Sequence, residues 1–179
     1  MSSGKVDNEQ KIRFCGLGGM GIILVSVILG KAAIYDGKNA LQTQSYGAEQ
    51  RGTKVKSDVI ISDSNSILCP IIDKIDILIA LSQEAFDFYL PDVKKNGLIF
   101  INSDLIDVNE NETYVKIPAT SLARKLDNEK VSNIIILGAL IKKTNLVSSN
   151  SIIHSINNTI TKNNREINIK AFETGYNFS

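Results

Sequence analysis

A glycine-rich turn between two apolar segments does most to limit the folds open to this chain. Residues 11–16 have the pattern of a short apolar strand, and the run from Ile22 to Ala33 is long enough for a helix. The residues between them have G-x-G-x-x-G spacing, with one extra glycine inside the motif: Gly16, Gly18, Gly19 and Gly21. Such a turn leads a strand directly into a helix and leaves backbone N–H groups at a positive helix N-terminus. The sequence therefore predicts a Rossmann-like first βαβ unit.

Apolar periods of two and of 3.6 residues alternate along the rest of the chain. Further strands are expected at 38–43, 54–62, 75–81, 98–102 and 114–117. Helices are expected at 19–36, from Ser82 to about Leu90, and at 122–126, 131–143 and 149–160, with 166–178 as an amphipathic helix or a docked tail. This alternation predicts an α/β protein with a single doubly wound, mostly parallel sheet and a helical C-terminal part. We expect residues 1–10 to form a flexible polar tail and residues 11–179 to form a single domain.

The first predicted helix is apolar on nearly every side. Ile22, Val25 and Leu29 share one face, and Ile23 and Val27 lie on another, with almost no charge before the last turns. A sheet can cover only one side of such a helix. The second side is therefore expected to contact either another subunit or another helix of the same chain.

Composition excludes several classes of function. A net charge of +1 gives no general attraction to nucleic acid or to an anionic membrane, and the apolar runs are too short to span a bilayer. The two cysteines, Cys15 and Cys69, are expected to stay reduced, as in a cytoplasmic protein, and cannot supply the four thiolates that an iron–sulfur cluster usually takes. The single histidine, His154, has no cysteine or aspartate at ligand spacing, so no metal site is predicted.

Two polar segments follow predicted strands and are candidates for a ligand site or a subunit interface. The ligand sites of open α/β sheets lie outside the carboxyl ends of the strands. Residues 44–53 form the first candidate, a predicted loop in which Arg51 offers a forked guanidinium for a carboxylate or phosphate. The second begins at Ser82, which is also a plausible helix N-cap. The candidate residues of the two segments are Gln44, Ser45, Tyr46, Gly47, Arg51, Gly52, Ser82 and Gln83.

The glycine turn itself has three interpretations. It could bind a dinucleotide, it could bind another anion such as a phosphate of CoA, or it could serve close packing between strand, helix and a neighbouring subunit. A Rossmann NAD site normally ends its second strand with an acidic residue, whereas here that strand ends Gln42-Thr43-Gln44. A free-standing NAD(P)-binding oxidoreductase or nucleotide-sensing domain is therefore the alternative rather than the main interpretation.

An ordered set of motifs resembles the gamma subunit of 2-oxoacid:ferredoxin oxidoreductases. The motifs are GLGGMG at 16–21, QSYGAEQRG at 44–52, DVIISD at 58–63, Pro70, DILIALSQEA at 76–85, IPAT at 117–120, Asn133 with LGAL at 137–140, and NIKA at 168–171. The Gln-Ser-Tyr-Gly loop and the Asn-Ile-Lys-Ala tail are closer to the 2-oxoglutarate type than to the indolepyruvate type. The chain departs from the family pattern at Met20, where a glutamine is usual, and at Ala48 and Thr53.

The resemblance implies a role within a larger enzyme. In that family the complex decarboxylates a 2-oxoacid on thiamine diphosphate with Mg, passes electrons through iron–sulfur clusters to ferredoxin, and transfers the acyl group to CoA. The cofactors are held mainly by the alpha and beta subunits. We therefore expect this chain to bind no cofactor and to hold no catalytic residue of its own, to pack on the catalytic subunits, and to help enclose the CoA or substrate side. A pure scaffold without any ligand is the remaining option.

Overall fold

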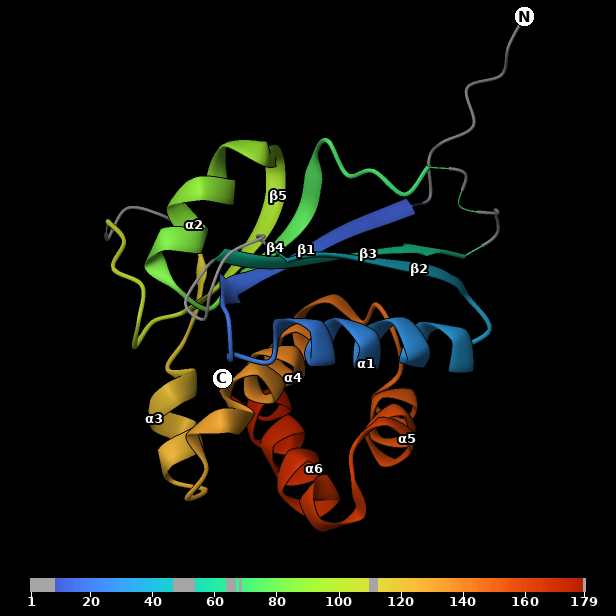
Figure 1. Cartoon of the computed structure of the whole chain (residues 1–179), viewed down its shortest axis with the longest axis vertical. Helices are drawn as coiled ribbons and strands as arrows, with labels where there is room; N and C mark the ends of the chain where they lie inside the picture. Colours follow the sequence, from blue (N-terminus) through green and yellow to red (C-terminus); the bar gives the residue numbers. More distant parts are fainter. Residues whose placement is uncertain (1–8, 47–53, 64–66, 68, 110–112, 179) are drawn as a thin grey trace, which may run out of the picture.

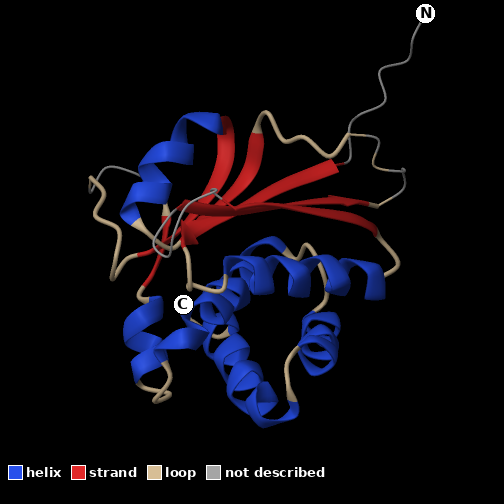
Figure 2. Cartoon of the chain, in the orientation of Figure 1, coloured by secondary structure: helices blue, strands red, loops and turns tan. Residues whose placement is uncertain are grey.

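A six-stranded mixed sheet organises the chain, with helices on both of its faces (Figures 1 and 2). The computed structural model describes residues 9–46, 54–63, 67, 69–109 and 113–178. The strands are β1 (Glu9–Leu17), β2 (Asn39–Tyr46), β3 (Lys54–Ser62), β4 (Ile75–Ala80), β5 (Val93–Asn102) and β6 (Val115–Ile117). They lie in the order β2-β3-β1-β4-β5-β6. Five strands point the same way and only β3 opposes them, so the predicted fold class is confirmed.

The helices divide unequally between the two faces. Figure 1 shows α2 on one side of the sheet and the larger helical layer on the other. The helices are α1 (Ile22–Tyr35), α2 (Gln83–Tyr89), α3 (Ala119–Arg124), α4 (Ser132–Thr144), α5 (Ser149–Thr159) and α6 (Lys162–Tyr176), with short 3-10 turns at Leu90–Asp92 and Glu129–Val131. Among the described helices, none is both long and apolar enough to cross a membrane.

The structure differs from the sequence-based expectation at several element ends. β2 continues to Tyr46, so the first residues of the predicted loop at 44–53 belong to a strand. β5 begins at Val93 rather than near residue 98, and α6 is longer than expected. Glu9 and Gln10 pair with β3, whereas residues 1–8 of the predicted tail lie outside the described residues. Strand β3 also lies between β1 and β2, so the first βαβ unit joins two strands that are not neighbours.

Helix α1 is covered from both sides by its own chain. Its sheet side packs on β2 and β3, and its second side packs on α5, where the Ser155 hydroxyl donates to the Ile28 carbonyl over 2.8 Å. Asp36, at the end of α1, accepts hydrogen bonds from Ser148 and Ser151 at the start of α5. Of the two coverings considered for this helix, the structure therefore shows the one from the same chain. Three large side chains remain partly exposed on α1: Leu24, Ile34 and Tyr35.

The sheet separates two hydrophobic clusters of unequal size. The larger lies between the sheet and the layer of α1, α4, α5 and α6, and the smaller lies beneath α2 and includes Cys15, Leu78 and Phe86. In the smaller cluster, Arg13 and Asp58 form a buried ion pair with two hydrogen bonds of 2.7 Å. Apolar packing around this paired charge therefore covers the part of the second face that lies beneath α2.

The two cysteines are expected to differ sharply in reactivity. Burial raises the pKa of the Cys15 thiol to about 12, although the nearby Arg13 guanidinium opposes that rise, while Cys69 is exposed. Because the thiolate is the reacting form, iodoacetamide at about pH 8 should modify Cys69 and leave Cys15 intact. Peptide mass spectrometry before and after unfolding measures both sites. Native labelling of Cys15 as fast as that of Cys69 would contradict this burial.

Candidate functional site

The carboxyl ends of the parallel strands meet at one edge of the sheet, as the sequence predicted. Because β3 runs the other way, its first residue, Lys54, lies at this same edge. The Lys54 ammonium is 3.5 Å from the Glu84 carboxylate in the first turn of α2 and 4.5 Å from the centre of the Phe88 ring. Ser82 caps α2 by accepting a hydrogen bond from the Ala85 N–H. The strand that follows residues 44–53 and the start of α2 are therefore in direct contact.

The structure describes only some of the candidate residues in the first polar segment. Gly47, Arg51 and Gly52 lie outside the described residues. Tyr46 is the last residue of β2. Gln44 and Ser45 lie within β2 and are exposed. These two line a cavity of about 310 Å³ on the sheet, together with Thr43, Lys56, Asp58 and residues 70–72.

The glycine turn is closed largely by side chains of this chain. The Met20 sulfur accepts from the Leu17 N–H, and the Met20 N–H donates to the Leu17 carbonyl. A Cβ atom on Gly16 would lie 2.9 Å from the Ile22 side chain and 3.3 Å from that of Leu81. These contacts use the N–H groups of Leu17 and Met20, which an anion at the turn would need. They favour the packing interpretation of the turn.

Two other glycines of the turn are required by backbone conformation. Gly19 has φ 96° and Gly21 has φ 70°, a region that residues with a Cβ rarely adopt. At Gly21 space is restricted as well, because a Cβ would collide with the Asn133 amide. That amide donates to the Gly21 carbonyl over 3.1 Å and so joins α4 to the start of α1.

Asn133→Ala is expected to lower the free energy of unfolding by about 1–2 kcal/mol, because it removes the hydrogen bond of a buried side chain that links distant parts of the chain. Thermal unfolding measures the change. The control is Asn158→Ala, which truncates an exposed side chain on α5 and should change the stability little. Equal losses in the two variants would show that the link between Asn133 and Gly21 contributes little.

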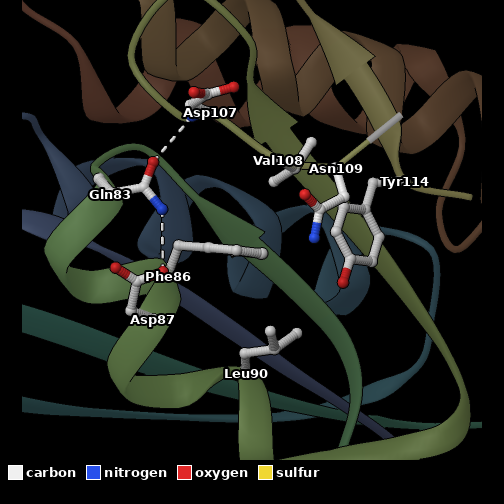
Figure 3. A pocket seen from close by; sticks show the side chains of 8 residues that line it. All are labelled: Gln83, Phe86, Asp87, Leu90, Asp107, Val108, Asn109 and Tyr114. Carbon is white, nitrogen blue, oxygen red and sulfur yellow. Dashed lines mark hydrogen bonds between the residues drawn. The ribbon is translucent and has the colours of Figure 1, made fainter. Parts of the chain in front are cut away.

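A second cavity, of about 290 Å³, lies between α2 and the chain after β5 (Figure 3). Gln83 spans its rim: the side-chain oxygen accepts from the Asp107 N–H over 2.8 Å, and the nitrogen donates to the Asp87 carboxylate over 2.9 Å. The Tyr114 ring packs edge-on against Phe86. The remaining lining residues are Leu90, Val108 and Asn109.

Most polar residues of this cavity were not predicted from the sequence. Gln83 was a candidate, but Asp87, Asp107, Asn109 and Tyr114 were not. Asp107 and Asn109 could have been found by the rule that led to Ser82, because both follow the carboxyl end of a strand. The cavity offers carboxylates, amides and a phenol, which suit hydrogen bonding to a polar group. The described residues contain no group of three or more His, Cys, Asp or Glu side chains placed to hold a metal ion.

Comparison with known proteins identifies the family. Residues 11–178 match the sequence model described as pyruvate ferredoxin/flavodoxin oxidoreductase. The chain belongs to this family. It is 43% identical to the 2-oxoglutarate synthase subunit KorC of Methanocaldococcus jannaschii over 98% of this chain and 97% of that protein. It is 32% identical to the pyruvate synthase subunit PorC of the same organism over 93% and 95% of the two chains.

Two solved structures have the same fold. The gamma subunit of a keto/oxoacid ferredoxin oxidoreductase from Geobacter sulfurreducens superposes with a TM-score of 0.81 at 38% identity, covering 94% of both chains. The fold also occurs in a 2-oxoglutarate:ferredoxin oxidoreductase from Magnetococcus marinus, with a TM-score of 0.83 at 22% identity. There it covers 94% of this chain but only 30% of the longer one. The fold thus occurs both in a separate subunit and as part of a longer chain.

Proposed function

We propose that this chain is the gamma-type subunit of a 2-oxoglutarate:ferredoxin oxidoreductase complex. The observation that carries the proposal is the match to KorC along nearly the full length of both chains. The reaction would convert 2-oxoglutarate and CoA to an acyl-CoA and CO₂, with the electrons passing to ferredoxin. The alternative of a free-standing NAD(P)-binding protein finds no support, because β2 is not adjacent to β1 and lacks the acidic residue of a ribose site.

In this proposal the chain acts with alpha and beta subunits in the cytoplasm. Thiamine diphosphate with Mg and the iron–sulfur cluster belong to those subunits, in keeping with the two cysteines of this chain. The proposed contact with the catalytic subunits is the carboxyl edge of the sheet, including the glycine turn, residues 44–52, Ser82 and Gln83. The contact between Lys54 and Glu84 supports treating the two polar segments as one surface.

Anaerobic affinity purification of the tagged chain from its host tests this proposal. Co-purified subunits with thiamine and cluster motifs, and CoA-dependent reduction of a viologen dye by 2-oxoglutarate, are the expected results. Turnover of pyruvate instead of 2-oxoglutarate would overturn the proposed substrate but would support the assignment to an oxidoreductase complex. A monomer or homodimer without such partners would overturn the proposed function.

Arg51→Ala is expected to lower the activity of the complex by about tenfold or more, the effect of losing a charge-assisted hydrogen bond to an anionic group. The melting temperature of the isolated chain should change little, because the proposed partner of Arg51 is not part of this chain. Arg165→Ala on α6 is the control and should leave activity unchanged. A loss of stability as large as the loss of activity would contradict this role for Arg51.

A further inference from the structure

A groove with a volume of about 450 Å³ follows the outer edge of β6, at the end of the sheet opposite to β2. One wall is the strand itself, and the other is the last part of α4. The groove is separate from the two cavities described above and shares no lining residue with them.

Apolar side chains line the base of the groove. Val115 and Ile117 project from β6 toward the large hydrophobic cluster, and Ala139 and Phe178 lie across from them. Val115 and Phe178 are only partly buried. The groove therefore presents apolar surface that a partner could cover.

Two lysines of α4 supply the charge. Lys142 and Lys143 both line the groove and both are exposed. Neither has a carboxylate within 4.0 Å in the part of the chain that the structure describes, whereas Lys38, Lys54 and Lys94 each have one. The Lys142 ammonium lies 5.0 Å from the centre of the Tyr176 ring. Lysines near a helix C-terminus complement the helix dipole, but this does not account for the apolar groove beneath them.

The main chain of β6 supplies a third element of recognition. The Ile117 carbonyl accepts from the Ser103 N–H on the β5 side over 2.9 Å. Because main-chain groups alternate in direction along a strand, those of Lys116 point away from β5, toward the side of β6 where the described residues place no further strand. A partner at this edge thus meets one donor and one acceptor from the same residue. An extended peptide can satisfy both, whereas a small anion can use only the donor.

We propose that this groove binds an extended acidic segment of a partner subunit. The segment would lie along β6 and exchange hydrogen bonds with the main chain of Lys116, a strand-addition mode of peptide recognition. Its carboxylates would pair with Lys142 and Lys143, and its apolar side chains would cover Val115 and Phe178. The inference rests on the proposed function, in which the chain is one subunit of a complex.

A charge-reversal variant carrying Lys142→Glu and Lys143→Glu tests the proposal in the native complex. Like charges placed together across an interface repel, so partner recovery on affinity purification should fall by about tenfold or more. The matched control carries Lys162→Glu and Lys170→Glu on α6 and should recover its partners normally. Because all four lysines are exposed, thermal unfolding should show that both variants fold.

Zero-length carbodiimide cross-linking of the wild-type complex identifies the occupant. Cross-links from Lys142 or Lys143 to aspartate or glutamate in a partner subunit are the expected result. Cross-links to a second copy of this chain, no cross-links at these lysines, or normal recovery of the charge-reversal variant would each overturn the inference while leaving the proposed function intact. If the wild-type chain recovers no partner subunit at all, the proposed function fails and this inference fails with it.

Discussion

Asp58→Ala is expected to lower the free energy of unfolding by about 3–5 kcal/mol, because it leaves a buried guanidinium without its counter-ion. The Arg13 residue is only 2% exposed, and Asp58 accepts two of its N–H groups at 2.7 Å. Burial alone would lower the pKa of Arg13, but Asp58 raises it above its ordinary value, so Arg13 stays charged. Asp92 contacts the same guanidinium at 3.3 Å and is half exposed, so it can replace only part of the lost interaction.

The double variant Arg13→Met with Asp58→Leu separates the cost of an unpaired charge from the value of the pair. Apolar replacements of a buried ion pair are often neutral, so this variant should recover most of the stability lost in Asp58→Ala. Urea unfolding of the wild type, Asp58→Ala and the double variant measures these differences in stability. Glu129→Ala, which breaks an exposed ion pair with Arg124, is the control and should have little effect. If Asp58→Ala is no less stable than this control, the buried pair does not matter for folding.

The elements of the fold could be predicted because each has a clear hydrophobic period. The alternation through Val55, Val59 and Ile61 places these residues in the large cluster, as expected for one face of a strand. Periodicity defines which face of a strand is buried but does not define its direction or its neighbours. The antiparallel insertion of β3 between β1 and β2 could therefore not be predicted from the sequence.

Burial of Arg13 is a second feature that the sequence does not reveal. Alternation along β1 places Arg13 opposite to Phe14, which would suit a solvent-facing position. In the structure α2 and the chain near Ile72 cover that face, and the Ile72 carbonyl accepts from Arg13. The long-range contact between Asn133 and Gly21, 112 residues apart, was missed for the same reason. Local patterns say little about which distant segment covers a given face.

The candidate site was predictable only as a region. The rule that ligand sites follow the carboxyl ends of parallel strands brings Ser82 and the end of β2 at Tyr46 to one edge. It does not indicate that Gln83 would bond to the main chain of Asp107, or that Tyr114 would pack against Phe86. These contacts depend on the path of the chain after β5, which carries no periodic signal. The individual roles of the residues at this edge accordingly stay proposals.

Gly175→Ala is expected to be among the most destabilising single-methyl changes in this chain. Helices α4 and α6 cross where Gly138 and Gly175 allow their backbones to touch. A Cβ on Gly175 would lie 2.7 Å from the carbonyl carbon of Ile135 and would also collide with its oxygen. The obstacle is main chain rather than a flexible side chain, so the helices themselves must move apart. Overpacking of this kind costs about 3 kcal/mol, which corresponds to a fall in melting temperature of roughly 6–12 °C for a chain of this size.

The same substitution in α1 is the matched control and should act in the opposite direction. Gly30 lies inside a helix, and a Cβ there would meet no atom within 4 Å. Alanine is favoured over glycine in a helix interior by about 1 kcal/mol, so Gly30→Ala should raise the melting temperature by a few degrees. Scanning calorimetry of both variants checks the pair. The two changes add the same methyl group to a helix. Changes in melting temperature of opposite sign would therefore assign the cost to the contact between α4 and α6. An equal fall in both variants would rule that contact out as the cause.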